Sequence, residues 1–297
     1  ARIFVYGTAC PKSKIEIPSY SFKNRLETGN FAKQNISIEG RDIIPGDIEL
    51  NDLSWDTVYS KINDISVKTE SKNWDMWVLE ENNGVNILSW GWNTSGQLGD
   101  NTITNKSSPV LIAGNHEFVD IAHGAACYNN QFIAALKKDG SAWAWGRNFE
   151  GQLGDNTITN KSSPISVVGN HSFIKISSGE NNTLALKKDG SVWAWGNNAS
   201  GQLGNNTTTN RSSPVSIVGN HSFIEIMAGS STCAALKADG SVWTWGLNNY
   251  GQLGNNSLIS SSSPVSITGN HSFIAIFGNG QYFMGLKEDG SVWAWGL

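Results

Sequence analysis

The segment Leu184-Ala-Leu-Lys-Lys-Asp-Gly-Ser-Val-Trp-Ala-Trp195 decides the fold, because large and small side chains alternate on both sides of Asp189-Gly190. Alternation with a period of two is typical of β-strands, whose successive side chains point to opposite faces. Asp-Gly between two such runs favours a hairpin with a two-residue type I′ turn. The register that this turn predicts places Leu186 opposite Trp193. It gathers the Leu and Trp side chains on one face and Ala and Val on the other.

This hairpin belongs to a repeated unit. The tetrapeptide Gly-Gln-Leu-Gly occurs four times, at intervals of 55, 50 and 50 residues, beginning at Gly96, Gly151, Gly201 and Gly251. The same turn dipeptide recurs at Asp139-Gly140, Asp239-Gly240 and Asp289-Gly290. A fixed period of this size is typical of repeat proteins, in which each unit buries its apolar side only against neighbouring copies.

Two further short strands are expected in each unit, for example at 213–218, which begins with Ser-Pro, and at 222–226. Four short strands in about 50 residues, repeated several times, predict an all-β fold: a β-propeller of four-stranded antiparallel blades. A right-handed β-solenoid is the alternative, but its coils are usually shorter and lack tight Asp-Gly hairpins. Each Trp-x-Trp pair could serve as a ligand-stacking platform, yet packing between sheets explains every copy at once.

Three motifs carry a family resemblance: Trp-Gly-x-Asn-x-x-Gly-Gln-Leu-Gly, then Ser-Pro-Val, then Leu-Lys-x-Asp-Gly-Ser-Val-Trp-Ala-Trp-Gly, over residues 85–297. Together they resemble the regulator of chromosome condensation repeat family, and we expect a member of the bacterial or phage type. The resemblance implies a propeller, usually of seven blades. It also implies two kinds of function. The eukaryotic namesake exchanges nucleotide on the small GTPase Ran and docks on chromatin, whereas other members, some of them secreted by bacteria, only bind proteins.

We expect about five repeats here, as part of a larger, seven-bladed ring and of a longer chain. Residues 1–54 are interpreted as a degenerate first repeat with an insertion, because Arg2–Gly7 resembles a weakened copy of Ser-Val-Trp-Ala-Trp-Gly and the residues after it match the unit least. Regular repeats then fill 55–297, with blades near 55–113, 114–168, 169–218 and 219–268 and a partial blade at 269–297.

Composition narrows the partners. The formal net charge is −4 and no basic run occurs, which argues against nucleic acid. Long apolar runs are absent, so membrane insertion is not expected. The three cysteines have neither CxxC spacing nor an even count, so neither a metal site nor a disulfide framework is predicted. Repeats rich in Asn, Thr and Ser with little Lys favour an extracellular or virion surface and a place in a larger assembly.

Copies of the repeat differ mainly in two short segments. One follows Trp-Gly, at 92–95, 147–150, 197–200 and 247–250, and the other precedes the hairpin, at 125–131, 180–183, 230–233 and 280–283. The predicted register makes the two segments neighbours at the edge away from the Asp-Gly turns. Variable loops on a rigid scaffold commonly bind partners, although exposed loops also drift freely. The candidate binding residues are Trp92, Tyr128, Arg147, Phe149, Leu247, Tyr250 and Tyr282.

Catalysis is not expected. His116, His171, His221 and His271 occupy one repeat position, whereas a catalytic or metal residue belongs to a single asymmetric site. Asx-rich runs such as 100–105 lack the carboxylate density of calcium sites, and no cofactor is indicated. We therefore expect a non-enzymatic scaffold with a protein- or glycan-binding face. The alternative is a guanine-nucleotide exchange factor for a small GTPase, and a lectin is a third interpretation.

Overall fold

The computed structural model describes residues 84–124, 131–278 and 280–296, and four short strands upstream of them; side chains are described from Ile87 onward. The chain divides into two compact units, one made of Ala1–Thr8 with Asn73–Leu297 and the other of Ala9–Lys72. In the smaller unit, β2 (Ile36–Ile38) pairs with β3 (Arg41–Ile43) as a hairpin. All the sheets discussed below belong to the larger unit.

The larger unit contains five sheets whose strands follow one another along the chain. Their bounds are β1 (Val5–Tyr6), β4 (Met76–Glu81), β5 (Gly84–Gly91) and β6 (Lys106–Leu111); β7 (Phe118–His123), β8 (Phe132–Lys137), β9 (Ala142–Gly146) and β10 (Lys161–Ser166); β11 (Lys175–Ser178), β12 (Asn182–Leu186), β13 (Val192–Gly196) and β14 (Arg211–Ser216); β15 (Glu225–Ala228), β16 (Thr232–Leu236), β17 (Val242–Gly246) and β18 (Ser261–Ser266); and β19 (Ala275–Gly278), β20 (Tyr282–Leu286) and β21 (Val292–Gly296).

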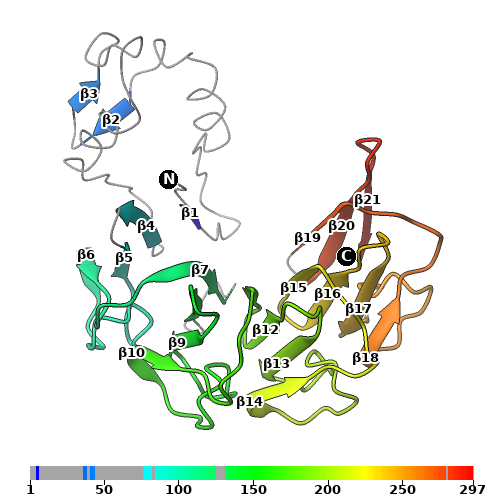
Figure 1. The fold of residues 1–297 in the computed structure, drawn as a ribbon, viewed down its shortest axis with the longest axis horizontal. Coiled ribbons are helices and arrows are strands. Elements are labelled where there is room, and N and C mark those ends of the chain that lie inside the picture. Colours follow the sequence, from blue (N-terminus) through cyan, green and yellow to red (C-terminus); the bar gives the residue numbers. More distant parts are fainter. Residues whose placement is uncertain are drawn as a thin grey trace. The chain divides into compact units, whose positions relative to one another are not determined.

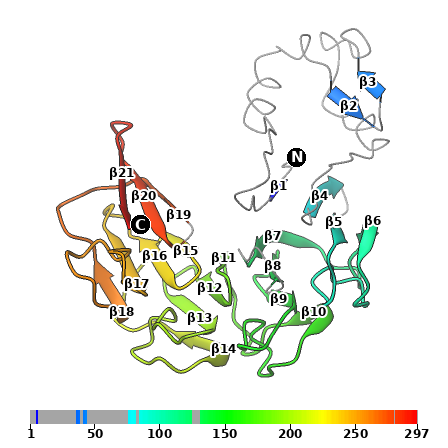
Figure 2. The same ribbon diagram turned by 180° about the vertical axis from the view of Figure 1, so that it is seen from behind.

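The all-β prediction is confirmed, since every regular element among the described residues is a strand and the sheets are antiparallel. Four sheets have four strands and the fifth has three. Successive sheets lie side by side as propeller blades, with β7, β11 and β15 on their inner side and β10, β14 and β18 on their outer side (Figure 1; the same arrangement from behind in Figure 2). In each of the three four-stranded sheets from β7 to β18, the Asp-Gly turn lies at one end of the strands and the variable segments lie at the other. We call these two ends the Asp-Gly edge and the loop edge.

The hairpin is correct, but its predicted register is wrong by one residue. Leu186 pairs with Val192, not with Trp193, which instead lies opposite Ala185. The reason is the turn: Lys187 N donates to Ser191 O at 2.9 Å, so the loop has three residues, 188–190. Only Gly190 in this loop has a positive φ, +82°, which is the geometry of a type I turn followed by a glycine bulge rather than type I′.

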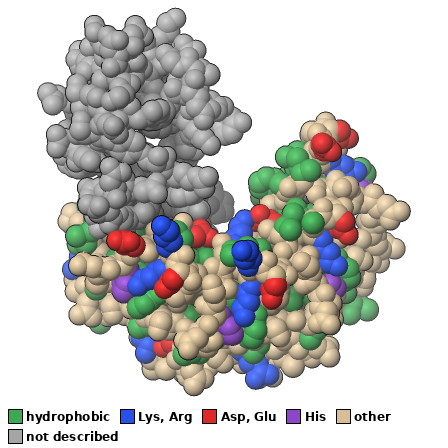
Figure 3. Space-filling view, viewed as in Figure 1, with side chains coloured by type: hydrophobic (Ala, Val, Ile, Leu, Met, Phe, Trp, Pro, Cys, Tyr) green, Lys and Arg blue, Asp and Glu red, His purple; other side chains and the backbone are tan. Residues whose placement is uncertain are grey.

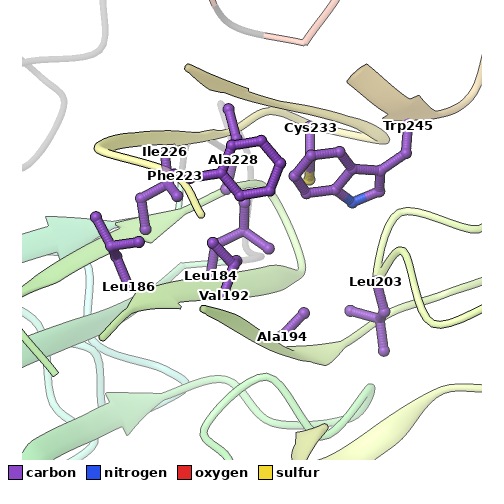
Figure 4. Close-up of a cluster of buried hydrophobic side chains, with 11 residues drawn as sticks. Leu184, Leu186, Val192, Ala194, Leu203, Phe223, Ile226, Ala228, Cys233 and Trp245 are labelled. Atoms are coloured by element: carbon purple, nitrogen blue, oxygen red, sulfur yellow. The ribbon is translucent and has the colours of Figure 1, made fainter. Parts of the chain in front are cut away.

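This register separates Leu and Trp onto opposite faces of the sheet. The Leu face of one blade packs against the Trp face of the next, and this contact forms a core between blades (Figure 4). In one such core, the first blade contributes Leu184, Leu186, Val192, Ala194 and Leu203, and the next contributes Phe223, Ile226, Ala228, Cys233, Ala235 and Trp245. No blade therefore buries its apolar surface alone, as the repeat period predicts.

A directional hydrogen bond accompanies the packing. The fully buried Trp195 donates from Nε1 to the carbonyl oxygen of Gln152, which lies in the Gly-Gln-Leu-Gly turn of the preceding blade, at 2.9 Å. Equivalent bonds of 3.1 and 2.9 Å join Trp145 to Gln97 and Trp245 to Gln202. In these three motifs the second Trp thus satisfies its only polar atom across the blade boundary, as a buried indole requires, whereas Trp295 Nε1 is buried with no hydrogen-bond partner.

The inner strands are linked by polar contacts that differ from blade to blade. Lys175 Nζ pairs with the Glu225 carboxylate of the next blade. The Ile176 N–H donates to Asp120 Oδ2 at 3.4 Å, and burial raises the pKa of that carboxyl. These contacts therefore join the inner strands of neighbouring blades, β7 with β11 and β11 with β15.

The first Trp of each motif stacks with a histidine and a lysine near the Asp-Gly edge. The ring centroids of His171 and Trp193 are 4.1 Å apart, and Lys187 Nζ lies 4.5 Å from the Trp193 ring centroid. Burial, with the nearby lysine charge second, lowers the pKa of His116, His171 and His221. The repeated histidine is therefore a packing group beside the indole.

The N-terminal strand differs from its interpretation. The likeness of Arg2–Gly7 to Ser-Val-Trp-Ala-Trp-Gly predicts that Tyr6 lies in the Trp-Gly strand, which is the third strand of a blade. It instead pairs with Met76 of β4, in the first place of the sheet order β1-β4-β5-β6. Most of the degenerate first repeat interpreted at 1–54 lies outside the described residues.

Trp195→Ala is expected to lower the free energy of unfolding by roughly 3–5 kcal/mol, because it leaves a cavity between two blades and removes the bond to Gln152. Trp193→Ala should cost less, since that indole is half-buried. Urea denaturation of both variants checks this order. A larger loss for Trp193→Ala would mean that the two indoles have been assigned to the wrong environments.

Stability should fall as the pH drops from about 7.5 to about 5. The lowered folded-state pKa of the three histidines means that the unfolded chain, with His pKa near 6.5, binds more protons in this range. Their stabilising effect is complete above about pH 7 and is lost on acidification. Denaturant titrations at both pH values test this, and replacing His116, His171 and His221 together by Gln should flatten the dependence. An unchanged slope in that variant would exclude the stacked histidines as its cause.

Candidate functional site

The two variable segments lie next to each other at one edge of the blades, which we call the loop face. It comprises 92–95, 147–150, 197–200 and 247–250 with 180–183, 230–233 and 280–283. Backbone hydrogen bonds of 3.0, 2.8 and 2.9 Å join the two segments within a blade, from Arg147 N to Gln131 O, from Asn197 N to Asn181 O and from Leu247 N to Ser231 O. The two segments are therefore neighbours, as the sequence predicts. The error of one residue in the predicted register does not affect this, because it leaves both segments at the same edge.

A buried asparagine builds each loop. Asn148 is fully buried, and its Nδ2 donates to Asp155 Oδ1 at 3.0 Å and to the carbonyl oxygens of Thr157 and Thr159 at 3.1 Å. Its Oδ1 accepts the Leu153 N–H at 2.9 Å. One side chain therefore holds the loop 155–160 against the segment 147–150 and the Gly-Gln-Leu-Gly turn. The equivalent residues are Asn93, Asn198 and Asn248.

Most of the candidate binding residues lie on this face. Trp92, Phe149 and Tyr250 are 45%, 60% and 59% exposed. Arg147 and Leu247 are half-buried at the start of their segments. The three aromatic side chains come from three different blades, so the loop face presents separate apolar points rather than one continuous patch.

Two candidates stand apart from this group. Tyr128 lies outside the described residues. Tyr282 lies in strand β20, opposite Gly296, and is 39% exposed. Its equivalents Asn182 and Thr232 are completely buried between blades. The strand position, rather than the loop, therefore governs the surroundings of Tyr282.

Further apolar side chains are exposed in the loops that follow these segments, and the sequence analysis does not count them as binding residues. The loops that wrap around the buried asparagines expose Ile103, Ile158 and Leu258 by 67%, 62% and 65%, and the adjacent Ile259 by 78%. The Asx content of these runs points toward calcium ligation and away from their aliphatic residues. The signal was an aliphatic residue at one repeat position in an otherwise polar loop, where exposure of a large apolar side chain is informative.

Polar contacts join the loops of neighbouring blades. The Arg147 guanidinium stacks over the Phe149 ring, 5.1 Å from its centroid, and donates to Asn181 Oδ1 of the next blade at 2.5 Å. Glu150 Oε2 accepts from Asn210 Nδ2 at 2.7 Å, and this bond also crosses the boundary. Arg147 and Phe149 are therefore held in a defined arrangement, which reduces the entropy lost when a rigid loop binds.

Two groups that could carry chemistry, the Cys233 thiol and the Asp189 carboxylate, are shielded or engaged. Burial raises the pKa of the Cys233 thiol to about 12, so it carries no thiolate at neutral pH. Asp189 Oδ1 accepts from Ser191 N at 2.9 Å and so closes the hairpin turn. Among the side chains that the structure describes, no three His, Cys, Asp or Glu converge as metal ligands. The same part of the chain has no helix long and apolar enough to cross a membrane.

Comparisons with known proteins agree with this architecture. Residues 74–297 match the family described as RCC1-like domain. The protein RCC2 homolog of Danio rerio is 36% identical over 95 residues, which cover 31% of this chain and 19% of the relative. Human WBSCR16 has a similar structure, with a TM-score of 0.63, 24% identity and coverage of 75% of this chain and 59% of the other.

A third likeness is to Prp20p of Saccharomyces cerevisiae, whose structure was reported with its binding properties to Gsp1p and histones. It gives a TM-score of 0.57 and 26% identity, with coverage of 77% of this chain and 56% of Prp20p. The chain spans less than two thirds of the length of each of these relatives. The family match covers the larger part of the sequence, including every blade described above from β4 onward. The chain therefore belongs to the RCC1-like domain family of β-propellers.

Proposed function

We propose that this chain is a non-enzymatic protein-binding scaffold whose partner docks on the loop face. The observation that carries the proposal is that the constant and the variable positions of the repeat lie in different parts of each blade. Residues between and within the blades are almost unchanged from copy to copy, whereas Trp92, Phe149 and Tyr250 are exposed on one face and each occurs in a single copy. Exposed aromatic residues on a rigid framework are typical energetic centres of protein interfaces.

A protein partner is better supported than a glycan. Stacking of a sugar ring needs an open aromatic face, and the Trp-x-Trp pairs of the sheets from β7 to β18 offer none; in the last sheet, Trp293 is 47% exposed but stacks with His271 and Lys287. Trp195 is fully buried, and Trp193 is covered by His171 and Lys187. The open rings are the scattered ones on the loops, and they are accompanied by exposed aliphatic side chains such as Ile158. Mixed aromatic and aliphatic anchors suit a protein surface.

Regulation of a small GTPase is the second candidate function. It rests on the likeness to Prp20p, with its reported binding to Gsp1p, and on family membership. Fold alone does not carry an activity, because one scaffold hosts many functions. Release of labelled GDP from a Ran-type GTPase, with and without this chain, measures it directly.

A location at the cell or virion surface is also part of the proposal. It is supported only by the polar, Lys-poor composition of the repeats, in which charged residues make up 15% of the chain. Fractionation of the source cells or particles, with detection by antibody, tests it; recovery in a nuclear fraction would contradict it.

The deciding experiment replaces Arg147, Phe149 and Tyr250 together by Ser. Proteins from a lysate of the source organism are captured on immobilised wild type and on this triple variant, then quantified by mass spectrometry. Partners of the loop face should be lost from the variant by about tenfold or more. Stability should change little, since each exposed loop substitution usually costs within about 0.5 kcal/mol.

The matched control replaces Lys138 and Lys188, which are exposed beside the Asp-Gly turns on the opposite edge. This variant should retain the partners. Lys237 is unsuitable as a control because its Nζ lies 4.5 Å from the Trp243 ring centroid and contributes to packing. If the control variant lost the partners and the triple variant retained them, the binding surface would lie at the Asp-Gly edge, and the proposed loop face would be wrong.

A further inference from the structure

One cation on the loop side of the blades lacks the partner that its repeat equivalents have. Lys106 and Lys161 form ion pairs of 3.2 Å with Asp100 and Asp155, six residues earlier in each copy. In the next copy the basic residue is Arg211, but the residue six positions earlier is Asn205. In the copy after that, both charges are gone, because Asn255 and Ser261 occupy the two positions.

The carboxylates are built into the other two copies. Burial alone would raise the pKa of Asp155, but hydrogen bonds from Thr157 and Asn148 and the contact with Lys161 outweigh it and lower the pKa. Asn205 keeps the same frame: its Oδ1 accepts from Thr207 Oγ1 at 2.8 Å and from Asn198 Nδ2 at 3.2 Å. Compared with Asp155, Asn205 therefore lacks only the carboxylate charge, because an amide NH2 group stands in place of the second oxygen.

Arg211 lies where it can act with the loop residues of the neighbouring blade. It begins β14 opposite Gly196. The turn at Gly151 packs on it so closely that a Cβ there would lie 2.9 Å from the Arg211 carbonyl oxygen. Phe149 and Glu150 immediately precede that turn, so Arg211 borders the segment that carries two of the candidate binding residues.

The surrounding charges leave Arg211 without a counter-ion in the described part of the chain. No carboxylate oxygen there lies within 4.0 Å of its guanidinium nitrogens, and its Nε is buried with no hydrogen-bond partner. Glu150 is the adjacent carboxylate, and Asn210 Nδ2 holds it at 2.7 Å. Arg147 is the adjacent cation, engaged with Asn181 and the Phe149 ring.

We propose that Arg211 is the charge anchor of the loop face and binds a carboxylate from an acidic, partly apolar segment of the protein partner. This inference rests on the proposed function and names the chemistry of the partner. The partner's carboxylate takes the role that Asp155 has beside Lys161 in the preceding copy. A guanidinium suits this role better than an ammonium, because its planar fork binds carboxylates with two parallel hydrogen bonds.

A polyanion fits this surface less well than a short acidic segment. Glu150 and Glu180 lie on the same loops and would repel a continuous phosphate chain, and the chain carries a net charge of −4. Phe149, 60% exposed, lies two residues before the turn at Gly151 that packs on Arg211, and Ile158 in the same loop is 62% exposed, so apolar contacts are available on this loop. Acidic side chains interspersed with apolar ones therefore complement the site.

The probe is a phage-displayed library of random peptides selected on the full chain. Some selected peptides should bind the wild type but not the variant in which Arg147, Phe149 and Tyr250 are replaced by Ser. These peptides bind at the loop face. Among these, Asp and Glu should be enriched over the unselected library. Their affinity should fall by about tenfold or more in Arg211→Ser, whose new residue already stands at the equivalent position 261.

The sharper variant is Asn205→Asp. It supplies the missing carboxylate with almost no change of shape, so the chain should fold normally while Arg211, still present, is neutralised as Lys161 is. Peptide affinity should again fall by about tenfold. The matched control, Lys161→Ser with Asp155→Asn, copies the Ser261 and Asn255 pair into the preceding blade and should leave affinity unchanged.

Each result separates the two proposals. Peptides that need the loop residues but tolerate both Arg211→Ser and Asn205→Asp would overturn the anchor and leave the proposed function standing. A loss in Arg211→Ser without one in Asn205→Asp would mean packing rather than charge, and would also overturn it. Absence of acidic enrichment, or displacement by a DNA oligonucleotide but not by an acidic peptide, has the same consequence. Failure to recover any loop-dependent peptide overturns both proposals.

Discussion

The hydrogen bond from a buried indole to the carbonyl oxygen of the preceding Gly-Gln-Leu-Gly turn is the contact on which the rest of the molecule depends. Trp195 reaches Gln152 in this way. The bond ties the core between two blades to the turn that ends the variable loop, so packing and loop geometry cannot change independently. The loop face is consequently anchored to the core beneath it, which favours a pre-organised binding surface.

Much of the fold could be predicted because the relevant signals are local and repeated. Alternation around Asp189-Gly190 indicates a hairpin wherever it occurs, and a period near 50 residues indicates blades. The register could not be obtained this way. Asp-Gly is compatible with a two-residue loop and with a three-residue loop, and the choice depends on whether Asp189 or only Gly190 takes a positive φ. One residue of difference moved every Leu to the face opposite Trp.

The candidate site was predictable in its position but not in its membership. Variation between copies located the loops, because it marks the residues that packing does not constrain. Tyr282 shows the limit of that argument: it varies, yet it occupies a strand position that other copies bury. Arg211 shows the opposite limit. Compared with Lys161 at the same repeat position, Arg211 looks like a conservative replacement. Only the ion pair of 3.2 Å between Lys161 and Asp155 reveals that the copy with Arg211 lacks a carboxylate partner.

Nearly identical blades create a problem of order during folding. Since any Leu face fits any Trp face, a blade could dock on the wrong neighbour within its own chain or in another molecule, which is a known failure of repeat proteins. The boundary contacts that differ from copy to copy oppose this. Lys175 with Glu225, Arg147 with Asn181, and Glu150 with Asn210 form where the blades meet in sequence, and Lys175, Arg147 and Glu150 each occur in a single copy. These polar pairs therefore favour the order of blades seen in the structure over other pairings of the same apolar faces.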